Sequence, residues 1–223
     1  MCYHVSTPNS DLLLEIESDK TIEYNFETIY HVSGFNRPVL PVTLNNNIDS
    51  IVAARWKLIP TWTRTEEDAN KNANTLNAIG EEVFEKKTYK NLIGSNRGLL
   101  YVNGFFEPHS TNGVKNDETY YISDPHSPIF TLGIVFNKWN GYNTFSILTT
   151  EANEFMADIH NLGKRMPLLI PSDTRHEWLL AESREEIESL IIPYKGELKG
   201  HRTFRVTSAR GIDTNIPTIQ NEI

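Results

Sequence analysis

The sequence predicts an α+β fold in which mostly antiparallel strands form a barrel-like core and a few helices flank it. Short segments of strong β-propensity recur along the chain and are separated by Gly, Pro and Asn. Helical patterns are fewer and do not alternate regularly with these segments, as they would in a parallel α/β protein. The 223 residues, 39% of them hydrophobic, are enough to bury the core of a single domain spanning residues 1–223.

The predicted strands are runs rich in Val, Ile, Tyr, Phe and Thr, the residues that fit a pleated sheet best. They cover residues 98–106, 119–123, 129–136, 144–149, 167–170 and 202–207. Two polar segments rich in Asn are typical of turns, namely Asn45-Asn46-Asn47 and Thr111-Asn112-Gly113.

Three helices are predicted. Residues 80–92 carry mixed charge and good helix formers. A second helix is expected to end at Leu180, with Ser172 or Asp173 as its N-terminal cap. The third follows Ser183, which together with Glu186 forms the pattern of a capping box ahead of an apolar stretch.

The net charge of −8 argues against a general nucleic-acid-binding protein, because contacts to phosphate require Lys and Arg. The charge is unevenly distributed, however. Residues 11–27 hold six acidic residues and one basic residue, whereas residues 195–211 hold five basic residues and one acidic residue. A local basic face is therefore compatible with the acidic total, although two solvated surfaces explain the charge pattern equally well.

Cysteine content and the N-terminal residues indicate where the protein works. The single cysteine, Cys2, excludes an internal disulfide and a cysteine-based zinc site. No apolar run is long enough to span a bilayer, and the first residues lack the basic and apolar regions of a signal peptide. We expect a cytoplasmic monomer without a metal ion or another cofactor.

Cys2 carries the most specific chemistry in the sequence. Methionine aminopeptidases remove Met1 when the next side chain is small, which would leave an amine and a thiol on adjacent carbons of Cys2. An α-amine has a pKa of about 7.7–8.0, so part of it is unprotonated near neutral pH and can attack an aldehyde to form a Schiff base. The thiol can then close a five-membered thiazolidine ring. Position alone fits an ordinary frayed terminus equally well.

A series of short motifs resembles the SRAP family, the SOS response-associated peptidase-like proteins that process abasic sites. Each motif is weak alone, but together they occur in the family's order from residue 2 to about residue 207. They are Met1-Cys2-Tyr3-His4, Trp56-Lys57-Leu58-Ile59-Pro60-Thr61-Trp62 (family W-G-L-I-P-x-W), Asn77-Ala78-Ile79-Gly80-Glu81 (N-A-R-x-E), Asn103-Gly104-Phe105-Phe106-Glu107-Pro108 (D-G-F-[FY]-E-W), Thr149-Thr150-Glu151-Ala152-Asn153, and Ile159-His160-Asn161 with Arg165-Met166-Pro167 (I-H-x-R-M-P).

The resemblance implies four catalytic residues. Cys2 would be the covalent nucleophile, and Asn77 would hold the ring-opened sugar or the cysteine amine by hydrogen bonds. Glu107 would be the acid and base that helps to form and resolve the Schiff base. His160 would position or protonate the sugar hydroxyl. Groups with pKa values near neutrality transfer protons best, and partial burial after the aromatic run would raise the pKa of Glu107.

The resemblance also implies DNA contacts, and several of these differ from the family pattern. We expect contacts from His4, Trp62, Phe106, Arg165 and Thr207. Ile79 replaces an arginine expected to bind phosphate, and His4 replaces another arginine by a group that is cationic only part of the time at neutral pH. Lys57 stands where the motif has Gly, Pro108 where it has Trp, and residues 162–164 are inserted before Arg165. Aromatic side chains could stack on bases, although core packing is the better interpretation for Phe105.

The function implied is covalent capture of abasic sites in single-stranded DNA through a thiazolidine link to Cys2, with the protein nucleoid-associated when bound. The family pattern leaves open an AP-lyase activity and autocatalytic removal of Met1. Two other classes fit parts of the sequence. One is an N-terminal-nucleophile cysteine hydrolase or amidotransferase, although no downstream motif supports it. The other is a non-catalytic DNA-binding module, which Ile79 and the acidic charge favour.

Overall fold

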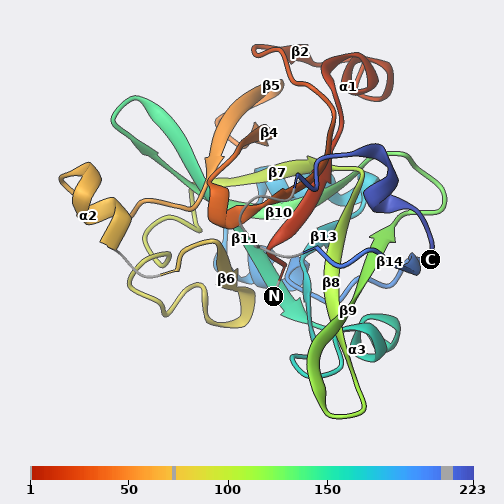
Figure 1. Cartoon of the computed structure of the whole chain (residues 1–223). Coiled ribbons are helices and arrows are strands. Elements are labelled where there is room, and N and C mark those ends of the chain that lie inside the picture. The colour runs from red at the N-terminus through yellow and green to blue at the C-terminus, as the bar shows by residue number, and fades with distance from the viewer. Residues whose placement is uncertain (1, 72–73, 207–212) are drawn as a thin grey trace.

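Two β-sheets make up most of the structure (Figure 1). The computed structural model describes residues 2–71, 74–206 and 213–223. The smaller sheet is antiparallel and has the strand order β14-β9-β8-β1-β3. Its strands are β1 (His4–Thr7), β3 (Ile29–Ser33), β8 (Gly104–Thr111), β9 (Val114–Ser123) and β14 (Lys199–Thr203).

The larger sheet curls into a ring. Its strands β11, β10, β7, β4 and β5 pair in that order, and parallel pairing of β5 with β11 closes the circle. The short strands β2, β6, β12 and β13 extend it. The bounds are β2 (Thr21–Ile22), β4 (Val39–Leu44), β5 (Asn47–Trp56), β6 (Asn77–Ile79), β7 (Arg97–Val102), β10 (Phe130–Trp139), β11 (Tyr142–Glu151), β12 (Arg165–Pro167) and β13 (Leu169–Ile170). The prediction of an α+β fold with a mostly antiparallel, barrel-like core is confirmed. The core is a ring-like sheet and not a strict barrel.

The helices are short and lie outside the sheets (Figure 1). The α-helices are α1 (Ser10–Ile16), α2 (Glu66–Lys71), α3 (Glu154–Ile159), α4 (Arg175–Leu180) and α5 (Arg184–Leu190), and the 3-10 helices are Gly34–Asn36, Gly80–Glu82, Ser172–Thr174 and Pro217–Gln220. The predicted capping box of α5 is present, with Ser183 and Glu186 as its partners. In the described parts of the chain, no helix has the length and apolar character that crossing a membrane requires.

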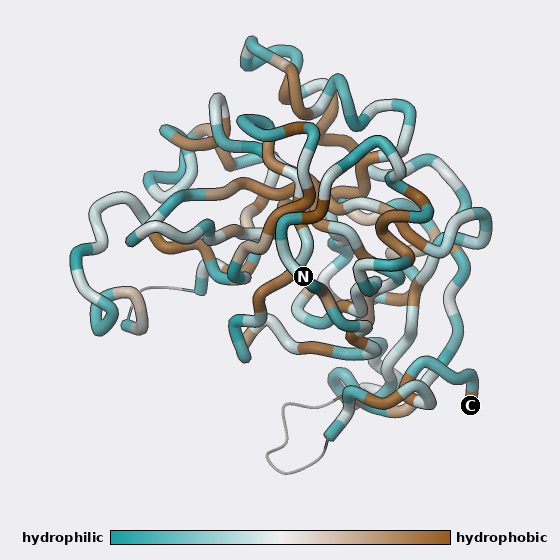
Figure 2. Tube along the Cα trace, turned by 90° about the horizontal axis from the view of Figure 1, so that it is seen from above, coloured by the Kyte–Doolittle hydropathy of each residue, from teal (hydrophilic) through white to brown (hydrophobic). Residues whose placement is uncertain are grey.

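The main core lies between the ring and the smaller sheet. One cluster of buried side chains joins Val5 and Phe105 of the smaller sheet to Leu100, Leu132 and Phe145 of the ring. Figure 2 shows hydrophobic segments gathered around the start of the chain, which lies in the middle of the molecule. The predicted strand at 98–106 crosses between the two sheets: it divides at Asn103 into β7, in the ring, and β8, in the smaller sheet.

The predicted helix at 80–92 is wrong. After the 3-10 helix Gly80–Glu82, the chain continues as successive turns. The buried side chains Tyr89, Leu92 and Ile93 keep the spacing of one helical face, but Val83 lies six residues before Tyr89 and off that face, so the segment as a whole does not present one apolar stripe. Packing against the ring therefore outweighs the helical propensity of the segment.

Arg97 joins α4 and the turn segment to the ring. Its buried guanidinium donates to the carbonyl oxygens of Ile93 (2.8 Å), Gly94 (2.8 Å), Trp178 (3.0 Å), Leu179 (3.4 Å) and Ala181. These bonds compensate for removing the cation from water and satisfy carbonyl groups where the chain leaves regular structure.

We therefore expect Arg97→Met to lower the free energy of unfolding by about 3 kcal/mol or more, because each buried carbonyl left unsatisfied costs about 1–3 kcal/mol. Arg184→Met is the control, because Arg184 is exposed and its guanidinium forms surface ion pairs with Glu85 and Glu188 and lies over the Phe84 ring, without donating to buried carbonyls among the described residues. Denaturant unfolding of both variants measures the difference, and equal stability would contradict the role given to Arg97.

Candidate active site

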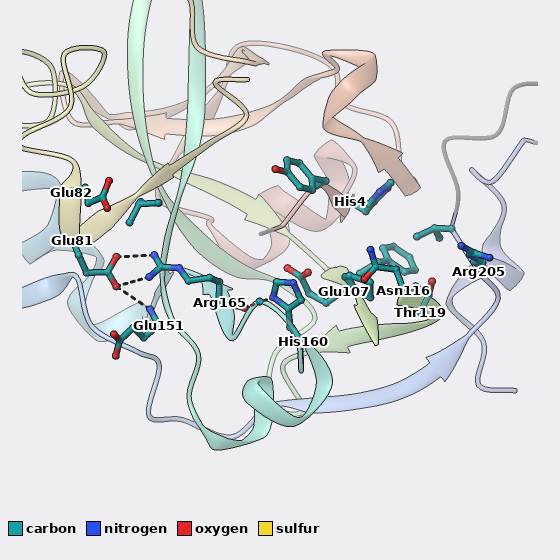
Figure 3. A pocket seen from close by; sticks show the side chains of 16 residues that line it. His4, Glu81, Glu82, Glu107, Asn116, Thr119, Glu151, His160, Arg165 and Arg205 are labelled. Atoms are coloured by element: carbon teal, nitrogen blue, oxygen red, sulfur yellow. Dashed lines mark hydrogen bonds and ion pairs between the residues drawn. The ribbon is translucent and has the colours of Figure 1, made fainter. Parts of the chain in front are cut away.

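A cavity of about 810 Å³ opens where the start of β1, β6, β8 and the chain after α3 meet (Figure 3). Its walls include the side chains of Tyr3, His4, Ile79, Glu107, His160 and Arg165. These residues come from segments that are far apart in the sequence, so the two sheets together create the site.

The pairing of β1 with β8 places Glu107 in the interior. His4 lies opposite Phe106 and Val5 opposite Phe105 in this pairing. Because side chains alternate along a strand, Glu107 shares the core-facing side of β8 with Phe105. The Glu107 side chain is buried, and neither carboxylate oxygen has a hydrogen-bond partner among the described residues. Burial raises the pKa of Glu107, partly offset by the nearby His160.

Cys2 is buried next to this carboxyl group. Its side chain belongs to the main core cluster, and its Sγ donates a weak hydrogen bond to the carbonyl oxygen of His4 at 3.7 Å. Burial, followed by the charge of Glu107, raises the pKa of the Cys2 thiol well above its usual range. The thiol is therefore protonated at neutral pH and is a poor nucleophile until a base accepts its proton.

Asn77 is another residue at the site whose polar side-chain atoms are buried and have no partner among the described residues. Strand β6 pairs in parallel with β11, which places Asn77 beside Ile147 and turns Ala78 into the core. Neither the oxygen nor the nitrogen of the Asn77 amide makes a hydrogen bond within the described part of the chain. Burial raises the pKa of the nearby Tyr3 hydroxyl, and the amides of Asn74 and Asn77 only partly offset that rise.

His160 caps the C-terminus of α3 and lies beside Glu107 (Figure 3). Its Nδ1 lies 2.9 Å from the carbonyl oxygen of Arg165. A carbonyl only accepts hydrogen bonds, so Nδ1 carries the proton, and Nε2 is the basic atom of the neutral ring. The ring packs tightly against Gly163, where an added Cβ would lie 2.6 Å from Cε1 of His160. The inserted residues 162–164 therefore help to fix the position of this histidine.

Arg165 lies at the pocket but is already paired. Its guanidinium makes two hydrogen bonds to the Glu81 carboxylate, at 3.0 and 2.7 Å, and a third to the carbonyl oxygen of Thr149 at 2.7 Å (Figure 3). Burial raises the pKa of Glu81, but hydrogen bonds led by those from Arg165 outweigh it and hold that pKa below its usual value. Most of the Arg165 charge is thus compensated within the protein. Ile79, 37% exposed, adds an apolar side chain to the same wall.

His4 and His31 form a buried neutral pair at the opposite wall. Nδ1 of His4 lies 2.9 Å from Nε2 of His31, and Nδ1 of His31 lies 2.6 Å from the Thr214 hydroxyl. Burial lowers the pKa of each ring to about 4, and for His31 the neighbouring His4 adds to the effect. The expectation that His4 is partly cationic at neutral pH is therefore wrong, because its surroundings disfavour the charged form.

The other expected DNA-contacting residues lie in different surroundings. Phe106 borders the pocket, but its side chain is only 1% exposed and packs against His31 and Tyr121. Trp62 is 46% exposed and outside this pocket, with the ammonium group of Lys87 5.0 Å from its ring centroid. Thr207 lies outside the described residues. Phe105 is fully buried in the core, as predicted.

The arrangement favours proton transfer near a nucleophile. Cys2, Tyr3, Asn77, Glu107 and His160 are close enough to influence one another's pKa values or hydrogen bonding. Residues 2–71, 74–206 and 213–223 contain no group of three or more His, Cys, Asp or Glu side chains that could hold a metal ion.

Comparison with known proteins shows likenesses across most of the chain. The family model "SOS response associated peptidase (SRAP)" matches residues 1–209. The abasic site processing protein YoaM of Bacillus subtilis is 29% identical over 77% of this chain and 75% of its own length. The abasic site processing protein HMCES of Rattus norvegicus is 22% identical over 58% of this chain and 44% of its own.

Solved structures show the same fold. A crystal structure of a protein from Bacteroides thetaiotaomicron superposes with a TM-score of 0.86 at 28% identity, covering all of both chains. Another, from Bordetella bronchiseptica, has a TM-score of 0.77 at 18% identity and covers 90% of this chain and 99% of its own. The match of the family model to residues 1–209, together with this shared fold, establishes that the chain belongs to the SRAP (SOS response associated peptidase) family.

Proposed function

We propose that this protein processes abasic sites by capturing them covalently in single-stranded DNA through Cys2. The observation that carries the proposal is the pair Asn77 and Glu107 next to Cys2, whose side-chain polar atoms are buried and make no hydrogen bond to any described residue. Buried polar groups without partners are costly, so they are retained where a ligand or a reaction uses them. The relatives in Bacillus subtilis and Rattus norvegicus, both named abasic site processing proteins, support the same substrate.

The reaction begins with the amine of Cys2 after Met1 has been removed. Because the thiol is held protonated by burial, the amine is the first nucleophile to attack the ring-opened aldehyde. The resulting carbinolamine loses its hydroxyl as water when Glu107 donates a proton, and the amine nitrogen gives up a proton in turn. The raised pKa of Glu107 keeps its carboxyl group protonated to higher pH than in an exposed residue, so it can act as that acid.

Ring closure uses the thiol. Glu107, which lost its proton in the first step, accepts the proton of Cys2 Sγ. The sulfur then adds to the imine carbon, and the nitrogen regains a proton. One aldehyde, one amine and one thiol thus yield a thiazolidine and one water. Asn77 donates to and accepts from the sugar hydroxyls, and Nε2 of His160 exchanges a proton with the sugar hydroxyl released by ring opening.

The first prediction concerns the thiol. The Cys2→Ser variant should form an imine that borohydride can trap, but no adduct that survives heating without it, because an oxygen-containing ring hydrolyses more readily. Denaturing gels with single-stranded DNA carrying one abasic site measure both products. Parent protein that retains Met1 is the control and should form no heat-stable adduct, since the nitrogen of Cys2 is then in a peptide bond and cannot close the thiazolidine ring. A Cys2→Ser adduct as persistent as that of the parent would exclude the thiazolidine.

A second prediction concerns the acid. Glu107→Gln should slow adduct formation by about 10²- to 10⁴-fold, the usual contribution of a positioned general acid. In the parent, the rate should fall as pH rises through the raised pKa of Glu107, because the proton donor is lost. That decline should be absent from the Gln variant. Single-turnover rates from pH 5 to 9 measure it, and an unchanged profile in Glu107→Gln would refute the assignment.

The third prediction concerns the position of His160. Gly163→Ala places a methyl group against the His160 ring, which must move and lengthen its hydrogen bond to Arg165. We expect slower adduct formation with little change in melting temperature. Gly94→Ala is the control, because a Cβ there would meet no atom within 4 Å. Equal rates for the two variants would show that the inserted residues do not position His160.

A further inference from the structure

A second, smaller cavity lies next to Tyr3, which also lines the active-site pocket. It has a volume of about 220 Å³, and its walls are Gly34, Phe35, Arg37, Lys57, Asn74 and Leu76. Tyr3 lines the first cavity and joins the two: its ring packs on Phe35 at 5.1 Å between centroids, and its hydroxyl accepts a hydrogen bond from Asn74 at 3.3 Å. A chain that leaves the active site past Tyr3 would enter this second cavity.

The charges of the two cavities differ in sign. Within the described parts of the chain, four glutamates and two arginines line the active-site pocket. One of the arginines, Arg165, forms an ion pair with Glu81, and the other is Arg205. Among the described residues, Arg37 and Lys57 line the second cavity and no acidic side chain does. Burial lowers the pKa of Lys57, and the nearby positive charge of Arg37 lowers it further, which shows that the two cations are close together. A polyanion bound in the active site is therefore attracted electrostatically to Arg37 and Lys57.

The backbone holds both cations in a conformation that side chains rarely adopt. The φ angle is +52° at Arg37 and +99° at Lys57. Lys57 stands where the family motif W-G-L has glycine, the residue that adopts such an angle without strain. The Nζ atom of Lys57 is further fixed by a hydrogen bond to the carbonyl oxygen of Ala69 at 3.2 Å. Strained residues of this kind concentrate at binding and catalytic sites, where the strain serves function.

Phe35 adds a surface for a nucleobase. Its side chain is 54% exposed, although one part of the ring packs on Tyr3. An exposed aromatic ring beside two cations is the combination by which proteins bind single-stranded nucleic acids, since bases stack on the ring and phosphates contact the cations.

We propose that Arg37, Lys57 and Phe35 form a subsite for a nucleotide that flanks the abasic site. Lys57 and Arg37 bind its phosphate, and Phe35 stacks on its base. This inference rests on the proposed function, because it assumes that single-stranded DNA occupies the active-site pocket. The subsite also explains how the chain could bind DNA with Ile79 in place of an arginine. Lys57 would supply the phosphate contact that Ile79 cannot make.

The test is non-covalent binding of single-stranded DNA that carries a tetrahydrofuran abasic analogue, which has no aldehyde and cannot be captured. Fluorescence anisotropy at several salt concentrations gives the affinity and its salt dependence for the parent, Lys57→Gly, Lys57→Gln and Lys20→Gln. Lys20 is the matched control, because its Nζ also donates to one backbone carbonyl, that of Ile48, near the opposite end of β5.

Both Lys57 variants should bind about ten-fold more weakly than the parent, with a salt slope smaller by about 0.7, the share of one phosphate contact in a single strand. Lys20→Gln should bind like the parent. Lys57→Gly should also melt at the same or a higher temperature, because glycine adopts the observed φ without strain, so weaker binding would not reflect unfolding.

The results separate this inference from the proposed function. If both Lys57 variants bind the analogue with the affinity and salt slope of the parent, the subsite is refuted, even if the parent captures natural abasic sites. If the parent binds the analogue through Lys57 but never forms an adduct with a natural abasic site, the covalent function fails and the subsite stands. An equal loss of affinity in Lys20→Gln would reduce the effect to net charge and overturn the proposal.

Discussion

The structure depends above all on the pairing of β1 between β3 and β8. An N-terminal segment is usually frayed, but here its backbone hydrogen bonds are satisfied on both sides, and Val5 packs into the main core. This pairing holds residue 2 inside the protein beside Glu107. It also sets the His4–His31 contact and brings Tyr3 next to both cavities. The properties proposed for the active site depend on Cys2 lying in the interior.

Holding the site in this way has an energetic cost. Glu107 and Asn77 lose their contacts with water and gain no partner in the described structure, whereas other buried polar groups, such as Arg97, are extensively hydrogen-bonded. The rest of the core must offset that cost. The same desolvation raises the pKa values of Glu107 and Cys2, which keeps the carboxyl group protonated to higher pH than in an exposed glutamate and, in the proposed reaction, leaves the first attack to the amine. In this account, desolvation of the polar side chains causes both the energetic cost of the site and its reactivity.

The sequence predicts the fold class, most strands of the C-terminal half and the capped helix α5, because these depend on local patterns. It also indicates Cys2, Asn77, Glu107 and His160 through short motifs. It does not predict β1, β3, β4 or β5, whose short or mixed patterns become strands through long-range pairing. The crossing from one sheet to the other at Asn103 is likewise invisible in a continuous β-type run.

Other features of the site could not be predicted because they join distant residues. His31 lies 27 residues from His4, and no local pattern marks the pair or the loss of charge that burial imposes on it. Glu81 neutralises Arg165 across 84 residues. The second cavity is formed by the 3-10 helix Gly34–Asn36 together with Lys57 and Asn74, which are distant in the sequence. The sequence marked one of these residues as unusual, Lys57, because it replaces the glycine of the family motif.

The bond between the protein and the captured sugar is the most direct test of the account. DNA with ¹³C at C1′ of its single abasic site can be bound by the protein and followed by NMR spectroscopy. The account predicts that the labelled carbon becomes a saturated carbon bonded to nitrogen and sulfur, and that digestion leaves it on the peptide that begins with Cys2. A labelled carbon that stays an unreacted aldehyde or its hydrate, persists as an imine, or is recovered on a lysine side chain would contradict the central claim.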